Sequence, residues 1–568
     1  MPQSNSPFTP ILENSGTAPS SSQKYDDTLS VHDYTNELAL IEAEILRLEA
    51  RRLELKGLID NHQALSISRS PPPQPSLPGD VWAEVFLHCI PVDPPPSPNK
   101  AEPPLLFTTI SRSWREIALN TPHLWTCMTI LLPPLPGTHL FAPVKERYRR
   151  MVNQRISGIR SWLDRSGSLL PLTLAIRDLP VRGEMDQMDP EHPAHAHCET
   201  FRDYMGIVFS YAGRLSKVMI DSRSLHAYQS SPYGIGCDPS PTQLPLLGDL
   251  EISSRNWGRV TDLHRKLVAC PSLRALTLRP GHDRILQGLP VHWSSLLRLE
   301  LRPRDRFNSV SWSEILPVLA QCSRLQSLVI GVASDRSDLS RIITSLQTPI
   351  NLPDLRSLCL GGSISDGEAT LLAFSTLLTP SLLDLSIRWT YPWMVGRTME
   401  WDFISDLLAR SNCQLVSLSL RLPMPETSMI ELLRSIPTLN NLDLDEIKHL
   451  YSGPDSFTIT EALLGALSPN LSPLAPPSVC PNLEHLSLTF FRWKRHTRTI
   501  ISSFARTWKT AIASGDPELG RLKSVTVKWA DVQPVRQPIE NILEEDPDVL
   551  LDWKPVWNYF ERDRGSPW

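Results

Sequence analysis

The stretch CPSLRALTL at residues 270–278 contains the pattern that decides the fold. Pro271 favours a turn, and a short apolar and polar alternation follows it. Successive side chains of a strand face opposite sides, so Leu276 and Leu278 are expected on one side and Thr277 on the other. The stretch therefore predicts a turn followed by a short strand with one buried side.

The same pattern, L-x-x-L-x-L with some positions occupied by Val or Ile, recurs along the chain. Its eleven copies begin at Leu215, Leu247, Leu273, Leu296, Leu325, Leu355, Leu382, Leu415, Leu439, Leu483 and Leu522. Most intervals between them are 23 to 33 residues, and the last two are 44 and 39. A leucine-rich repeat takes about 20–29 residues for one strand and one helix, and stacked repeats share a single core.

The intervals therefore predict an α/β leucine-rich-repeat solenoid, an irregular horseshoe, over residues 211–530. Apolar stretches between the strands, such as WSEILPVLAQCSRL at residues 312–325, predict the outer helices.

The composition indicates an intracellular protein that is not a general nucleic-acid binder. The net charge is -5 and the pI is near 6.3, so no excess of cations is available to neutralise phosphates. Nine cysteines are scattered singly, as expected in a reducing compartment. No signal peptide or membrane-spanning run is present, so we expect the cytoplasm, the nucleus or both.

Composition shifts divide the rest of the chain. We expect a disordered tail at 1–33, an amphipathic or coiled-coil helix at 34–62, a proline-rich linker at 63–76, a helical unit at 77–130, a connecting helical segment at 131–210 and a C-terminal tail at 531–568. The chain holds 53 prolines, many of them clustered at these boundaries.

The helix at 34–62 carries apolar side chains at alternating steps of three and four residues, the spacing of a coiled-coil seam. The seam consists of Leu38, Ile41, Ile45, Leu48, Arg52, Leu55 and Ile59, with Arg52 as its one charged member. Self-association, docking onto the same chain and a helix with one solvated face all remain open.

Two further apolar segments precede the repeats. LPGDVWAEVFLHCIP occupies residues 77–91 and FTTISRSWREIALNTPHLW occupies residues 107–125. Pro78 fits the first turn of a helix, and the apolar residues of each segment recur at helical spacing. A unit this small has too little interior for all of them, so some must face another surface.

These two segments resemble an F-box of the kind found in many fungal proteins. The resemblance covers about fifty residues and ends at the PHLW of residues 122–125; the proline-rich loop at 91–104 is longer than a compact F-box needs. It implies binding to the Skp-type adaptor subunit of a cullin-RING ubiquitin ligase, with the repeats selecting a protein substrate. The residues expected to contact the adaptor are Leu77, Pro78, Val81, Trp82, Val85, Phe86, Ile110, Trp114 and Ile117.

The alternative is a leucine-rich-repeat interaction scaffold without a ligase, in which the helical unit only caps the solenoid. In both interpretations, outward strand positions line a concave face. Five arginines, expected to bind the substrate, make its middle repeats basic: Arg279, Arg298, Arg302, Arg388 and Arg421. Asp443 and Asp445 follow with negative charge.

No catalytic motif accompanies these features. The sequence lacks the phosphate-binding, dinucleotide-binding, zinc-protease and nucleophile-elbow patterns, so we expect neither an enzyme nor a cofactor. The cluster His192, His195, His197 and Cys198 matches no regular zinc spacing, so we expect no metal.

Overall fold

A computed structural model gives the fold. It describes residues 27–68, 77–133, 142–178, 195–221, 240–253, 262–279, 286–302, 310–333, 343–344, 348–363, 367–389, 402–422, 424–446, 459–468, 479–490, 522–529 and parts of 501–510. The chain divides into two compact units, Met1–Pro78 and Gly79–Trp568.

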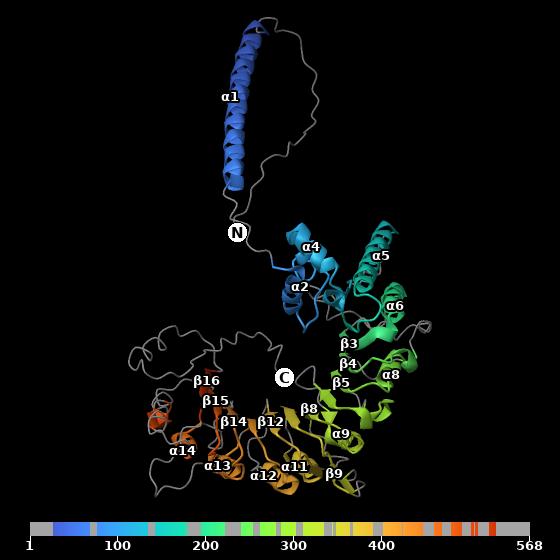
Figure 1. The fold of residues 1–568 in the computed structure, drawn as a ribbon, viewed down its shortest axis with the longest axis vertical. Coiled ribbons are helices and arrows are strands. Elements are labelled where there is room, and N and C mark those ends of the chain that lie inside the picture. Colours follow the sequence, from blue (N-terminus) through green and yellow to red (C-terminus); the bar gives the residue numbers. More distant parts are fainter. Residues whose placement is uncertain are drawn as a thin grey trace, which may run out of the picture. The chain divides into compact units, whose positions relative to one another are not determined.

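The second unit is built on one long, curved parallel sheet (Figure 1). Among the described residues the sheet has 14 strands, and neighbours along it follow the chain order. Its main strands are β1 (Cys127–Leu132), β2 (Leu172–Asp178), β3 (Leu215–Asp221), β4 (Asp249–Ser253), β5 (Ala275–Arg279), β6 (Arg298–Leu301), β8 (Ser327–Ala333), β10 (Ser357–Ser363), β12 (Asp384–Trp389), β13 (Ser417–Arg421), β14 (Asn441–Asp445), β15 (His485–Phe490) and β16 (Ser524–Trp529). The predicted leucine-rich-repeat solenoid of α/β class is confirmed.

Three minor strands accompany them. The short β7 (Val310–Ser311) pairs with β8, while β9 (Ile350–Asn351) and β11 (Leu377–Leu378) form a separate two-stranded pair.

The register of the sheet aligns the inward-facing side chains of every repeat. Leu250 lies beside Leu276, which lies beside Leu299, and the row continues through all the strands that follow. The next inward position of each repeat forms a second row, as in Ile252 beside Leu278. The described side chains of these rows are buried, except Val525 in β16, which is half-buried, so the repeats share one continuous core.

Helices cover the outer side of the curve in Figure 1. They are α8 (Asp262–Val268), α9 (Trp312–Leu319), α11 (Gly367–Ser375), α12 (Phe403–Ser411), α13 (Glu426–Arg434) and α14 (Glu461–Leu467). Aromatic rings join neighbouring repeats within this layer. Phe374 packs edge-on against Trp312 of α9 and Phe403 of α12, at centroid distances of 6.2 and 5.1 Å.

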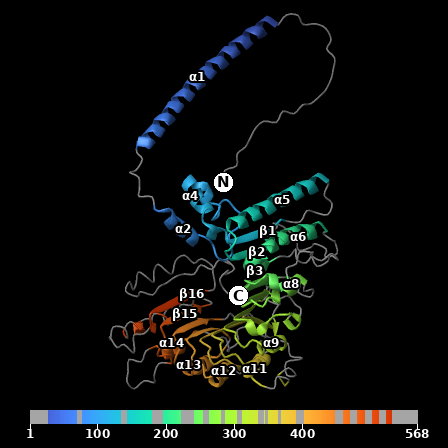
Figure 2. The same ribbon diagram turned by 45° about the vertical axis from the view of Figure 1, so that its right-hand side comes forward.

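The sheet begins earlier than the predicted start at residue 211. Strands β1 and β2 belong to it, and the segment expected to be connecting helix also holds α5 (Ala142–Arg165) and α6 (His195–Ser210) beside these first strands (Figure 2). Strand β1 pairs with β2, and β2 pairs with β3. Strand β1 lacks the L-x-x-L-x-L pattern, and the copy Leu169, Leu172 and Leu174 at β2 lies outside the run of eleven copies. The repeat spacing therefore missed two strands.

The helical unit is continuous with the solenoid through Trp125, which is completely buried. Its indole N–H donates a 2.8 Å hydrogen bond to the carbonyl of Ala118, and its ring packs edge-on at 4.9 Å against Trp162 of α5. The Arg165 guanidinium lies 4.7 Å from the centre of the same ring. One side chain thus joins the predicted 77–130 unit to the first helix of the solenoid.

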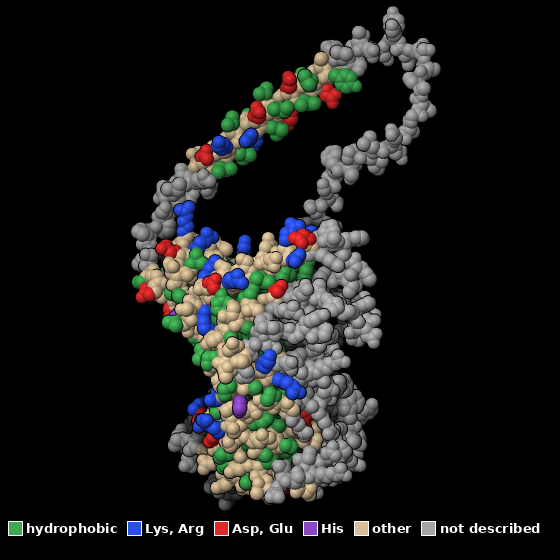
Figure 3. Space-filling view, turned by 90° about the vertical axis from the view of Figure 1, so that its right-hand side faces the viewer, with side chains coloured by type: hydrophobic (Ala, Val, Ile, Leu, Met, Phe, Trp, Pro, Cys, Tyr) green, Lys and Arg blue, Asp and Glu red, His purple; other side chains and the backbone are tan. Residues whose placement is uncertain are grey.

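The first unit contains α1 (Asp27–Ser68), which extends the expected 34–62 helix at both ends. Residues 27–33 and 63–68 contain no proline or glycine, so nothing stops the helix until the prolines that follow. Figure 3 shows hydrophobic side chains along the described part of this helix. The rest of the expected tail and linker, and the expected C-terminal tail at 531–568, lie outside the described residues.

Most described cysteines are buried, as expected for small apolar side chains. Burial raises the pKa of Cys127 and Cys270 to about 11 and that of Cys322 and Cys480 to about 12. In the described part of the chain, no helix is both long and apolar enough to cross a membrane.

Replacing Trp125 tests how far the helical unit and solenoid depend on each other. Trp125→Ala is expected to lower the free energy of unfolding by about 3–5 kcal/mol, because it opens a cavity beside Trp162. Trp125→Phe keeps a ring but leaves the Ala118 carbonyl without its donor, for a loss of about 1–2 kcal/mol. Urea denaturation followed by circular dichroism measures both, and equal losses would contradict this account.

His264 gives the solenoid a dependence on pH. It is buried within α8, and burial lowers its pKa from 6.5 to about 4. The unfolded chain binds this proton at a higher pH than the folded one, so stability present above pH 6.5 is lost as the pH falls toward 4. Between pH 7 and 5 the loss is about 2 kcal/mol.

Urea denaturation of wild type and His264→Leu at both pH values isolates this contribution. The variant, with an apolar side chain in the same place, is expected to lose less stability on acidification. An identical loss in the two proteins would show that other groups cause it.

Candidate functional site

Three short helices and a 3-10 turn build the N-terminal end of the second unit. They are α2 (Gly79–His88), α3 (Phe107–Ile110), α4 (Arg112–Leu119) and η1 (Pro122–Trp125). The expected single helix of the second segment is broken at Ser111, whose backbone is extended and whose hydroxyl accepts a 3.1 Å hydrogen bond from the Trp114 N–H. Ser111 therefore starts a new helix, a favoured role of serine.

Four aromatic rings hold these helices together. Phe86 of α2 stacks on Phe107 of α3 at 4.2 Å, and it packs against Trp114 of α4 at 4.8 Å. Trp82 lies 4.9 Å from Trp114. Phe86 is 1% exposed, so it is a core residue in this structure and not a surface contact. Trp82 and Trp114 are half-buried members of the same cluster.

The apolar residues that remain exposed are fewer than the sequence indicated. Val81 and Val85, one turn apart on α2, are 41% and 40% exposed. Ile110, at the end of α3, is 53% exposed. Ile117 is half-buried, with side-chain atoms close to Gly79.

Leu77 and Pro78 belong to the first unit and are both exposed. The sequence analysis missed Leu119, an exposed apolar side chain at the end of α4. It lies one helical turn after the exposed Arg115, on the outward side of α4.

The proline-rich loop between α2 and α3 is fixed to the edge of the sheet. The Thr129 hydroxyl donates to the carbonyl of Pro95 at 2.5 Å, and the Thr129 N–H donates to the carbonyl of Pro96 at 2.7 Å. Within the loop, the Ser97 hydroxyl donates to Glu102 at 2.7 Å, which lowers the pKa of that carboxyl group. The loop thus covers the free edge of β1.

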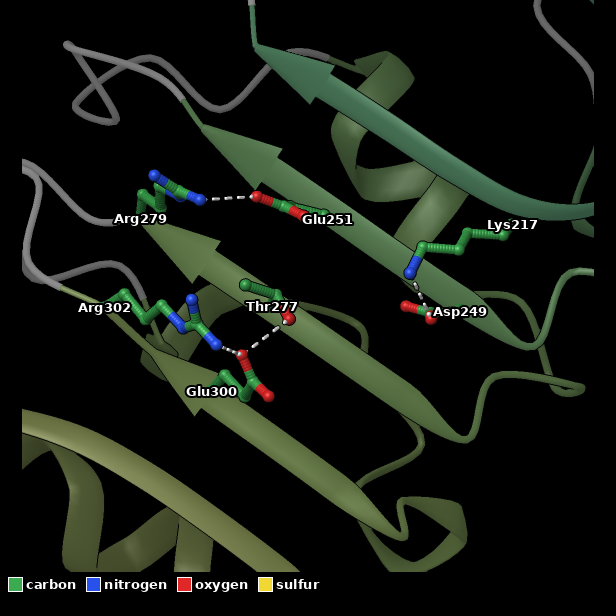
Figure 4. Close-up of polar contacts among 7 residues, drawn as sticks. All are labelled: Lys217, Asp249, Glu251, Thr277, Arg279, Glu300 and Arg302. Carbon is green, nitrogen blue, oxygen red and sulfur yellow. Dashed lines mark hydrogen bonds and ion pairs between the residues drawn. The ribbon is translucent and has the colours of Figure 1, made fainter. Parts of the chain in front are cut away.

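The concave face of the sheet, opposite the helices, carries the second candidate surface. Its side chains stand at the outward strand positions, and cations there pair with acids of the neighbouring strand or of the same repeat (Figure 4). Arg279 lies 2.9 Å from Glu251 and Arg302 lies 2.8 Å from Glu300, measured between nitrogen and oxygen. The hydroxyl of Thr277 also donates to Glu300, at 3.4 Å.

A similar network occupies the later repeats. One Arg388 guanidinium nitrogen lies 3.3 Å from Asp443, two strands away, and 3.4 Å from the hydroxyl of Ser419 between them. Ser419 donates to the same Asp443 oxygen at 3.2 Å. The other Asp443 oxygen, the Arg421 Nε and the Ser487 hydroxyl are buried without a hydrogen-bond partner among the described residues.

The two remaining expected arginines have no ion-pair partner among the described residues. Arg298 is exposed at the start of β6 and Arg421 is half-buried at the end of β13, and neither forms an ion pair within the described part of the chain. Two of the five arginines therefore offer an uncompensated positive charge.

The expected charge pattern of a basic middle followed by an acidic end is wrong for the described strands. Strands β8 and β10 carry only uncharged residues at these central positions, Val329 beside Cys359 and Gly331 beside Gly361. Charged networks lie on either side of them, each with both signs. Choosing arginines by charge alone missed Glu251 and Glu300, although both occupy outward positions between two inward side chains.

No group of three or more metal-binding side chains occurs among the described residues. The side chains of the His192 to Cys198 cluster fall outside that part of the chain.

Comparisons with known proteins add two distant likenesses. No protein-family model and no curated protein matches the chain. The crystal structure of the Rad7 and Elc1 complex in yeast matches with a TM-score of 0.33 and 15% identity, over 78% of this chain and 92% of that chain. A crystal structure of a Bacteroides fragilis protein matches with a TM-score of 0.27 and 13% identity, over 46% of this chain and 71% of that chain. Structural similarity this low does not indicate a shared function.

Proposed function

We propose that this chain is the substrate-recognition subunit of a cullin-RING ubiquitin ligase. Its helical unit would dock a Skp-type adaptor, and the concave face of its solenoid would bind a protein substrate. The chain itself would perform no chemistry: catalysis would belong to the partner subunits, and this chain would hold the substrate within their reach.

The observation that carries the proposal is the exposure of Val81 and Val85 on α2. They stand one turn apart on a helix that turns a different side, with Phe86, to the core, so their exposure is built into the fold. Ile110 adds a third exposed apolar side chain from α3. These three residues occupy positions that the F-box resemblance assigns to the adaptor.

The proposed adaptor contacts are therefore Val81, Val85 and Ile110, with Leu77 and Pro78 from the preceding segment. Phe86, Trp82, Trp114 and Ile117 would act indirectly, by holding α2 and α4 in place.

The concave face supports the substrate-binding half of the proposal. Arg298 and Arg421 carry charge without an acidic partner in the described chain, and three buried polar atoms near Asp443 have no hydrogen-bond partner. Buried polar groups are normally satisfied, so a bound peptide could complete their hydrogen bonds. The charges of Arg279, Arg302 and Arg388 are compensated by acidic partners. These three residues would therefore contribute to the shape of the surface and to the alignment of the substrate more than to the net charge.

One observation favours a second interpretation, a leucine-rich-repeat scaffold without a ligase. Trp125 joins the helical unit to α5 as one core, which is what a solenoid cap requires. A cap needs no exposed apolar face, however, so adaptor binding separates the two interpretations.

Binding of the purified chain to a Skp-type adaptor tests the proposal. We expect Val81→Asp to weaken binding by about thirtyfold, because a charged carboxylate would replace a valine worth about 2 kcal/mol on burial. Ile110→Asp and the double change Leu77→Ala with Pro78→Ala should weaken it in the same way. Isothermal titration calorimetry measures the affinities.

The matched control is Val92→Asp, which makes the same change at an exposed valine in the proline-rich loop. It should leave affinity unchanged, and circular dichroism confirms the fold of each variant. A wild-type chain that fails to bind at tens of micromolar would leave the scaffold interpretation in place. Equal weakening by Val92→Asp would remove the proposed surface.

A further inference from the structure

The long helix α1 carries an apolar seam that no described residue of its own unit covers. The apolar members of the seam, from Leu38 to Ile59, are 45% to 58% exposed, and every described side chain of the helix is exposed. An exposed stripe of this length on a helix of 42 residues is a typical interaction surface.

The spacing of the seam is that of a two-stranded coiled coil. With Leu38 at heptad position a, positions a and d contain Ile41, Ile45, Leu48, Arg52, Leu55 and Ile59. The flanking positions e and g then contain Glu37, Glu42, Glu44, Glu49, Arg51 and Lys56. The charges are divided along the helix, with acids toward its N-terminal half and most bases toward its C-terminal half.

A parallel pair in register would be opposed by these charges. Each g position would face the partner's following e position, which places Glu37 beside the partner's Glu42 and Arg51 beside the partner's Lys56. Glu44 would likewise face the partner's Glu49. Arg52 would also meet the partner's Arg52 across the seam itself, where two like charges would be partly desolvated.

An antiparallel pair replaces some of these conflicts with attractions. When Ile45 faces the partner's Leu48, Leu38 faces the partner's Leu55 and Arg52 faces the partner's Ile41. The g positions then face each other, so Glu44 lies beside the partner's Arg51 on both sides of the two-fold axis. Glu42 lies beside the partner's Glu49, also on both sides of the axis, so two like-charged contacts remain beside the two attractive ones.

In this arrangement Arg52 would also lie close to acids. The partner's Ile41 is followed directly by Glu42 and lies one turn after Glu37, so the Arg52 guanidinium would reach a carboxylate instead of another guanidinium. Glu44 and Arg51 are exposed and already bridge to Arg47 and Glu54 of the same helix, at 3.4 and 2.6 Å. A second copy would extend these pairs into one network.

We propose that α1 pairs with α1 of a second copy of this chain as an antiparallel coiled-coil dimer. Charge complementarity selects both the second copy and the antiparallel direction. The dimer would carry two helical units and two concave faces. The inference is independent of adaptor binding, which is measured at a different surface.

Sedimentation of the full chain tests the dimer. We expect the mass of two chains at micromolar concentrations, and Ile45→Asp should give the mass of one chain, because it places a carboxylate in the centre of the seam. Leu53→Asp is the matched control on the outer side of the helix, and it should leave the dimer intact. A wild-type monomer, or a dimer unchanged by Ile45→Asp, would overturn the proposal.

Charge reversal tests the direction. Glu44→Arg should raise the dimer dissociation constant about tenfold in the antiparallel arrangement, because two attractive pairs become repulsive. Adding Arg51→Glu should restore it. In a parallel dimer the new arginine would face the partner's Glu49 and tighten association, which would contradict the proposed direction.

Asp60→Arg makes the same change of charge off the seam, so it should not alter the dissociation constant. Circular dichroism confirms that every variant keeps its helix, and adaptor affinity should be the same for wild type and Ile45→Asp. Loss of adaptor binding together with dimerisation would show that the two surfaces are not independent.

Discussion

Lateral pairing of parallel strands is the constraint on which the second unit depends. Each strand satisfies its backbone hydrogen bonds with the strands before and after it, so a repeat is complete only between two neighbours. The same register places one buried leucine directly beside the next, as with Leu276 and Leu299. Backbone pairing and the burial of apolar side chains therefore impose the same alignment, and the helices on the outer side close the core that results.

This constraint also explains the N-terminal end. A parallel sheet must finish somewhere, and an uncovered first strand would offer its backbone to other chains. Here two carbonyl groups of the proline-rich loop accept hydrogen bonds from Thr129, and Trp125 packs the helical unit against α5. The helices that end the sheet also present Val81 and Val85 to solvent. Capping and docking are compatible because they use different sides of α2.

The concave face follows the same geometry. Side chains between two inward residues come to lie in rows across the strands, so a charge on one strand meets whatever the next strand places beside it. Arg279 consequently meets Glu251 of the preceding strand, while Arg302 pairs with Glu300, two residues before it in the same repeat. The concave face carries both positive and negative side chains. It therefore favours a partner whose charges are complementary in position over a partner that has only a large net charge.

The sequence by itself determined the class of fold, the position of the eleven regular strands and the identity of their inward side chains. This was possible because these features depend on the local spacing of apolar residues, and each repeat contains that spacing independently of the others. It also located the helix that became α1 and the two apolar segments before the repeats. Only the tertiary structure decided that β1 and β2 join the sheet, that Phe86 is buried while Ile110 is exposed, and which arginines are paired. Each of these depends on which segments lie side by side. Packing and strand register between residues distant in the chain determine that arrangement.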